Sequence, residues 1–189
     1  MFENKNESLY SKQKNVKPKI DDVVGDILVG DALSCAQDFI SFIKEHKMNP
    51  SWASANSWKV SYKNKGVCYI RLHGAAEYYN MEAGSWSVNV HVQYDKKLQK
   101  LISGESDEIK TLVKNHVDNN VPCGGCMPGL DRRSVNKNFS NIAACTSIHM
   151  QNPDSEMIAF AKKLVLIRRE SIAENKIPKC RYIKPADRT

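Results

Sequence analysis

The sequence WKVSYKNKGVCYIRL, at Trp58–Leu72, decides the fold because it predicts a β-hairpin. Apolar and polar residues alternate along its first part, and a second apolar run follows the turn sequence KNKG at 63–66. Alternation with a period of two is typical of a half-buried strand, and a short glycine-containing turn between two such runs favours antiparallel pairing. We therefore predict strands at Trp58–Tyr62 and Val67–Leu72.

The segments around the hairpin complete the predicted fold. Trp86–Gln93 alternates tryptophan and valines with polar residues and predicts a third strand, antiparallel to the second. Apolar residues at helical spacing predict amphipathic helices that begin near Asp31, Ser106 and Pro153, with Asp31 and Ser106 as candidate N-caps. This order predicts an α+β fold, in which helices pack on one face of a small antiparallel sheet of at least three strands.

Composition predicts one globular domain with polar ends. The chain has 189 residues, of which 41% are hydrophobic and 26% charged, enough for a single core. Residues 1–20 predict a mobile basic arm, 21–174 a single α+β domain, and 175–189 a basic tail. For residues 21–29 the sequence allows either a short helix or an extended segment.

The net charge of +7 is concentrated at the two ends of the chain. Residues 1–20 contribute +3 and residues 161–189 contribute +6, so a basic tail could touch nucleic acid. No aromatic-interleaved basic stripe or recognition helix accompanies this charge, and solubilising termini are the preferred explanation. Because no apolar run reaches membrane-spanning length and the N-terminus lacks the apolar core of a signal peptide, we expect a cytoplasmic protein without a membrane partner.

Three of the six cysteines form a possible metal pattern. Cys123, Cys126, Cys145 and His149 have the spacing C-x2-C-x18-C-x3-H, which resembles the paired knuckles of a zinc site. If Cys145 and His149 lie in a strand, however, their side chains are about 13 Å apart, too far to bind the same ion. A redox dithiol and a glycine-rich loop with unliganded thiols are the alternatives, and the loop is favoured.

Aromatic residues gather on or beside the predicted sheet, and side chains of this kind with polar tips can line a ligand pocket. The candidate ligand-binding residues are Trp58, Tyr62, Tyr69, Tyr78, Tyr79 and Trp86. Ordinary core positions are the commoner explanation for such residues. The sequence contains no serine-hydrolase, P-loop, dinucleotide-binding or metalloprotease motif, so no catalytic residue is assigned.

The hairpin sequence, together with PCGGC at 122–126, FSNIAAC at 139–145 and NPDSEMIAFAKKLVLIRR at 152–169, resembles small bacterial α+β proteins of unknown function. The resemblance covers roughly residues 30–172. It implies a family without an assigned reaction, and it transfers no catalytic residue to this chain.

Three functional hypotheses remain. The preferred one is a non-catalytic small-molecule-binding or sensor domain that uses an aromatic-lined sheet face. The second is a zinc-stabilised module that binds a partner protein or nucleic acid. The third is a thiol-dependent enzyme, which would need a cysteine of low pKa.

Overall fold

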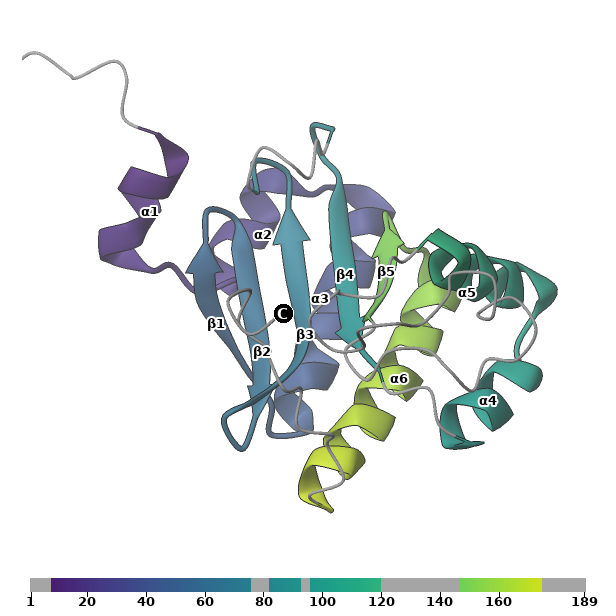
Figure 1. The fold of residues 1–189 in the computed structure, drawn as a ribbon. Coiled ribbons are helices and arrows are strands. Elements are labelled where there is room, and N and C mark those ends of the chain that lie inside the picture. Colours follow the sequence, from purple (N-terminus) through teal and green to yellow (C-terminus); the bar gives the residue numbers. More distant parts are fainter. Residues whose placement is uncertain (1–7, 76–81, 93–95, 120–146, 175–189) are drawn as a thin grey trace, which may run out of the picture. The chain divides into compact units, whose positions relative to one another are not determined.

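The computed structural model describes residues 8–75, 82–92, 96–119 and 147–174 (Figure 1). These residues contain helices and strands in an order that confirms the predicted α+β class. The elements are α1 (Leu9–Val16), α2 (Asp21–Ile27), α3 (Gly30–Glu45), β1 (Asn49–Ser54), β2 (Ser57–Tyr62), β3 (Lys65–Leu72), β4 (Trp86–His91), α4 (Lys96–Ser103), α5 (Asp107–Asn119), β5 (Ser147–Gln151) and α6 (Ser155–Ala173). Within the described ranges, no helix is long and apolar enough to cross a membrane.

The strands form one antiparallel sheet in the order β1-β2-β3-β4-β5. The three predicted strands are its middle members, and β3 and β4 point in opposite directions, as predicted (Figure 1). Sequence order and spatial order coincide because each strand pairs with its neighbour along the chain. The sheet therefore has its two edges at β1 and β5.

The chain divides into two compact units that both draw on β4, β5 and α6. The first unit comprises residues 1–89 with 150–162, and the second comprises 90–149 with 163–189. The boundary passes through secondary-structure elements rather than through a linker. A single domain over 21–174 stays a prediction.

The core of the first unit lies between β2, β3 and α3. Helix α3 buries one stripe of apolar side chains, which includes Phe39 and Ile43. Asp31 is not the N-cap that we predicted, because the helix begins one residue earlier, at Gly30. Gly30 has φ +57°, a conformation open to glycine, and this lets the chain turn into the helix without a side-chain cap.

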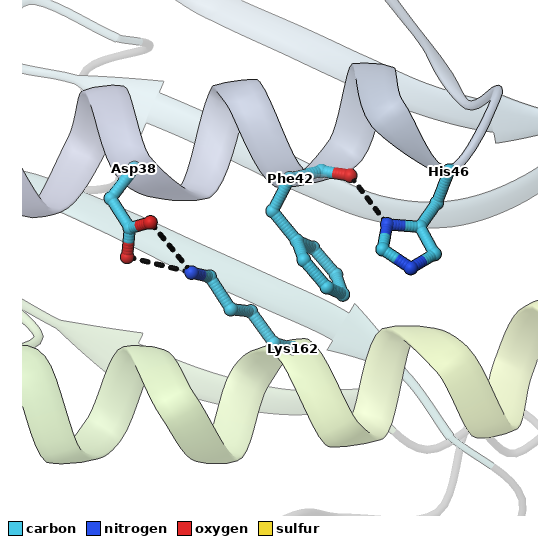
Figure 2. Close-up of polar contacts among 4 residues, drawn as sticks. All are labelled: Asp38, Phe42, His46 and Lys162. Carbon is cyan, nitrogen blue, oxygen red and sulfur yellow. Dashed lines mark hydrogen bonds and ion pairs between the residues drawn. The ribbon is translucent and has the colours of Figure 1, made fainter.

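Helices α3 and α6 lie side by side in this unit (Figure 2). Nζ of Lys162 lies 2.7 Å from both carboxylate oxygens of Asp38, and 5.2 Å from the centroid of the Phe42 ring. The Phe42 ring in turn contacts His46, with centroids 4.1 Å apart, and Nδ1 of His46 lies 2.9 Å from the Phe42 carbonyl oxygen. One lysine thus joins the two helices through an ion pair and a cation–π contact, and the strands pass behind both helices in this view.

Side chains cap two of the later helices. Oγ of Ser106 accepts a hydrogen bond of 3.3 Å from the Ile109 N–H, which confirms the predicted cap of α5. Oδ1 of Asp154 accepts one of 2.8 Å from the Met157 N–H at the start of α6.

In the second unit, ion pairs of 2.6 Å join Lys97 to Glu170 and Lys163 to Glu105. The buried apolar residues described in that unit are Val90, Val92, Leu98, Ile109, Val113, Ile148, Leu164, Val165 and Ile172.

Helix α1 lies where the sequence predicted a mobile arm, and polar contacts hold it to the sheet. Oε1 of Gln13 accepts from the Trp52 indole N–H at 3.1 Å and from the Asn56 backbone N–H at 2.8 Å. Nε2 of Gln13 donates to Oδ1 of Asn56 at 2.6 Å. Leu9 of α1 also packs closely against Gly74, whose φ is +83°. A Cβ at this position would lie only 3.1 Å from Cδ2 of Leu9. The helix has no buried residue of its own, and the Gln13 hydrogen bonds are joined by a contact between the Tyr10 and Trp52 rings, with centroids 5.8 Å apart.

Replacing Gln13 with alanine is expected to undock α1 and to leave the rest of the unit folded. Three hydrogen bonds are lost, and at about 1 kcal/mol each the local opening becomes more than tenfold more frequent. Hydrogen exchange measured along the chain should show faster exchange in Leu9–Val16 with little change in β2 and β3. The control is Gln37→Ala on the exposed side of α3. Unchanged exchange in α1 would contradict this anchoring role.

Strand β1 was not predicted, because its sequence NPSWAS has no apolar alternation and contains a proline. Its residues alternate between exposed and half-buried, as on a sheet edge. Pro50 lies across from Val60, and the register is irregular between Trp52 and Ser54. The edge is therefore short, bent and interrupted.

Candidate ligand site on the polar face of the sheet

A register shift in the hairpin decides which side chains of β3 face the core. Next to the turn, Tyr62 lies opposite Lys65. Beyond an irregularity at 60–61, Trp58 lies opposite Ile70 and Lys59 opposite Tyr69. One extra residue in β3 moves all of its later side chains to the other face. The shift places Ile70 on the core face with Trp58, and Tyr69 on the opposite face with Lys59.

Strand β4 extends this opposite face. The His73 N–H donates a hydrogen bond of 2.9 Å to the Ser85 carbonyl oxygen. An antiparallel ladder continued from this bond without a bulge places Ser87 across from Arg71 and Asn89 across from Tyr69. The two serines of the row, Ser57 and Ser87, then flank Arg71 from either side. We call this surface the polar face, and its members are Ser57, Lys59, Tyr69, Arg71, Ser87 and Asn89.

Three polar side chains in one row of this face are almost fully buried. Ser57 is 4% exposed, Arg71 6% and Ser87 1%. Arginine is almost never buried to this extent unless it is held by specific contacts. Cζ of Arg71 lies 5.0 Å from the centroid of the Tyr69 ring, a cation–π arrangement that fixes the guanidinium above the ring. The row is therefore a built polar environment rather than a solvated strand surface.

Three buried polar atoms of β4 have no hydrogen-bond partner among the described residues. Nε1 of Trp86 belongs to the core face, and Oγ of Ser87 and Oδ1 of Asn89 belong to the polar face. Leaving such an atom without a partner costs about 1–3 kcal/mol, so each one needs a reason. A bound molecule that hydrogen-bonds to them would remove this cost. These two oxygens make the polar face the candidate site.

The charge of this region is positive. Strands β2, β3 and β4 contain Lys59, Lys65 and Arg71 and no aspartate or glutamate. Lys59 is half-buried on the polar face, and Lys65 is exposed at the far end of the hairpin. The polar face thus contains an ammonium and a guanidinium group, two serine hydroxyls and one side-chain amide, which are binding groups rather than an acid–base pair.

Two of the predicted ligand-binding aromatics belong to the core. Trp58 and Trp86 have no exposed surface, and Nε1 of Trp58 donates to the Pro18 carbonyl oxygen at 2.8 Å. Nε1 of Trp86 is buried without a hydrogen-bond partner within the described ranges. Both indoles are enclosed by protein, so they anchor the sheet to its packing layer.

The tyrosines have other positions. Tyr69 lies on the polar face, and Tyr62 is half-buried at the end of β2, where Lys63 approaches its ring to 5.6 Å. Tyr78 and Tyr79 lie outside the described residues. Strand alternation separates Tyr69 from the two tryptophans, so these three do not share one aromatic face.

The proposed zinc ligands lie almost entirely outside the described residues. Cys123, Cys126 and Cys145 belong to 120–146, and only His149 is described, half-buried in β5. Among described side chains, no group of three or more histidine, cysteine, aspartate and glutamate residues could hold a metal. Zinc binding stays a prediction.

The two described cysteines are poorly suited to nucleophilic chemistry. Burial raises the pKa of the Cys68 thiol far above its ordinary value. The pKa of Cys35 is also raised, first by burial and then by the carboxylates of Asp31, Asp38 and Asp154. A reactive thiol needs the opposite shift, toward thiolate at neutral pH. Neither of them meets the requirement of the thiol-enzyme hypothesis.

The sequence analysis did not single out Lys59, Arg71, Ser87 and Asn89, which belong to the candidate site. A usable signal was present, because Ser87 and Asn89 alternate with the valines of β4 and must share a face. What the sequence did not show was the register that aligns them with Arg71 and Tyr69. Comparison of the chain with protein-family models, curated proteins and solved structures finds no match, so function has to be inferred from the geometry of the chain itself.

Proposed function

We propose that the protein is a binding protein that holds a small molecule on the polar face of its sheet. The supporting observation is the pair of buried orphan atoms, Oγ of Ser87 and Oδ1 of Asn89, beside a row of almost fully buried polar side chains. Polar groups in such positions destabilise the unliganded protein and stabilise a complex. The pattern is that of a site kept for a ligand.

Binding is favoured over catalysis by the groups present. The polar face supplies hydrogen-bond donors, cations and one aromatic ring, and burial raises the pKa of the Cys68 thiol on β3, away from nucleophilic chemistry. Small-molecule sites commonly combine a mostly preformed apolar surface with a few convergent polar groups. The preferred hypothesis is thus retained, with its site moved from the tryptophans to the polar face.

A thermal-shift screen tests this proposal. Neutral, cationic and anionic metabolites are added to the full chain, and a ligand at a hundred times its Kd should raise Tm by about 5–10 °C. Hits are then mapped by backbone amide NMR, and the largest perturbations are expected at Lys59, Tyr69 and Asn89. Asn89→Ala should weaken the hits, whereas Asn49→Ala, at an exposed position of β1, should not.

Two results would count against the polar face as a ligand site. The first is a screen without any hit, and the second is a set of hits whose perturbations lie elsewhere in the described chain. Zinc binding, contact with nucleic acid, cytoplasmic location and the bacterial resemblance remain predictions from the sequence.

A further inference from the structure

We infer that two copies of this chain associate through reciprocal contacts between two charged segments of the first unit, and this inference is independent of the polar face. The lysine segment, 8–19, contains four lysines and no carboxylate. The aspartate segment, 20–38, contains five aspartates and no lysine or arginine. A two-fold interface uses the same surface of both copies, so this surface must be self-complementary. Two segments of opposite charge meet that requirement.

The lysine segment presents cations that the chain itself does not neutralise. Its four lysines are exposed, and Lys12 and Lys17 take part in no ion pair among the described residues. Gln13 holds α1 on the sheet through Trp52. Lys12 and Val16 lie one helical turn apart and share a face of α1. The lysine segment therefore combines fixed backbone geometry with unpaired positive charge.

The aspartate segment presents the opposite charge in the same way. Asp22 and Asp26 lie four residues apart on α2, and Asp31 lies in the first turn of α3. All three are exposed, and none forms an ion pair among the described residues. The other two aspartates of the segment are paired with lysines of α3 and α6. No ion pair of the described chain joins the two segments, so their charges are available to a partner.

Exposed apolar side chains coincide with these charges. Val16 is 74% exposed and Val29 78%, the highest values among the large apolar side chains described. Lys17 follows Val16 directly, and Asp26 and Asp31 lie on either side of Val29. Each segment thus offers an apolar contact beside charges, and the two sets of charges have opposite sign. Pairing the lysine segment of one copy with the aspartate segment of the other removes both valines from water and brings lysines to aspartates.

A nucleic acid would fit only half of this surface. Its phosphates would be attracted by the lysine segment, and the unpaired aspartates of the neighbouring segment would repel them. It would also leave Val29 exposed. A second copy of the chain uses both segments at once, and for this reason it is the partner that we infer.

Sedimentation velocity of the full chain measures this association directly. We expect a monomer–dimer equilibrium whose Kd rises about tenfold between about 0.05 M and about 1 M NaCl, where the screening length falls to about 3 Å. A chain that stays monomeric at every concentration in low salt overturns the inference, as does association that salt leaves unchanged or strengthens. Growth beyond a dimer contradicts the reciprocal pairing, because a two-fold interface is closed.

Charge reversal tests whether the two segments meet each other. The lysine variant combines Lys12→Glu with Lys17→Glu, and the aspartate variant combines Asp22→Lys with Asp26→Lys. Each is expected to weaken the dimer about tenfold or more, because two-fold symmetry counts every reversed contact twice. Mixed in equal amounts, the variants should form a heterodimer with the Kd of the native chain, since each reversed segment again faces opposite charge. A mixture that stays monomeric overturns the inference.

A matched control on α4 separates this effect from net charge. Lys96→Glu with Lys100→Glu reverses two exposed lysines of the second unit. Like the lysine variant, it removes four positive charges and lowers the net charge from +7 to +3. The control should leave the dimer unchanged. If it weakens the dimer as much as the lysine variant does, net charge is the cause and the pairing of the two segments is overturned.

A labelled single-stranded oligonucleotide and its duplex test the alternative partner. Fluorescence anisotropy compares the native chain, the lysine variant and the α4 control. If the native chain stays monomeric and only the lysine variant loses the oligonucleotide, the lysine segment serves nucleic acid and the inference is overturned. If the native chain dimerises and the lysine variant and the control lose the oligonucleotide alike, that binding is general charge attraction and the inference is supported.

Discussion

Replacement of Trp58 by alanine is expected to lower the free energy of unfolding by about 3–5 kcal/mol. Trp58 has no exposed surface, it lies on the core face opposite Ile70, and its indole N–H donates to the Pro18 carbonyl oxygen at 2.8 Å. Alanine removes the largest side chain of the hairpin and leaves a cavity, and it also leaves that carbonyl without its donor. Chemical denaturation followed by circular dichroism measures the change.

Two further variants separate the causes of this loss. Trp58→Phe keeps most of the buried volume and removes only the hydrogen bond, so it should cost about 1–3 kcal/mol. Trp52→Ala, at the directly opposed position on the edge strand, removes a half-buried indole and should cost less than Trp58→Ala. Equal losses for Trp52 and Trp58 would contradict the difference in burial between the edge strand and the centre of the sheet.

The buried thiol of Cys68 is expected to make the protein lose stability at alkaline pH. Burial raises the pKa of Cys68 above its ordinary value of 9.0. Below pH 9 the thiol is protonated in both states and has no effect. Above pH 9 the unfolded chain releases the proton and the folded chain retains it, so stability falls as pH rises, by up to about 1.4 kcal/mol per pH unit.

The difference between variants isolates this contribution, because lysines and tyrosines also titrate in the alkaline range. The free energy of unfolding is measured from pH 7 to pH 10.5 for the native chain and for Cys68→Ala, which removes the titrating group. Alanine should lower stability at neutral pH and flatten its decline above pH 9. Cys35→Ala is the control at a half-buried position. Parallel curves for the native chain and Cys68→Ala would rule out the thiol as the cause.

The sequence predicted best where burial alternates with exposure. Trp58 and Val60 alternate with Lys59 and Ser61, and the hairpin follows from that pattern alone. The same logic found α3, whose buried stripe recurs at helical spacing. It failed for α1, because that helix is held by the polar side chain of Gln13 rather than by an apolar stripe.

The candidate site depended on information that a residue pattern does not carry. Counted outward from the turn pair Tyr62 and Lys65, a regular hairpin would place Tyr69 opposite Trp58, on the core face. The irregularity at 60–61 shifts the register by one and moves Tyr69 and Arg71 to the other side. The aromatic face expected from composition is thereby divided, and a polar face takes its place. The apolar residues of β3 were found, but their neighbours across the sheet were not.

The edge formed by β1 limits how the protein can self-assemble. A long, regular edge strand offers its free N–H and C=O groups as a template for another chain, which is a common start of fibrils. Pro50 has no N–H to offer, and the irregular register between Trp52 and Ser54 bends the strand out of line. Growth of the sheet by addition of a foreign strand is thus disfavoured at this edge, although the edge carries the half-buried indole of Trp52.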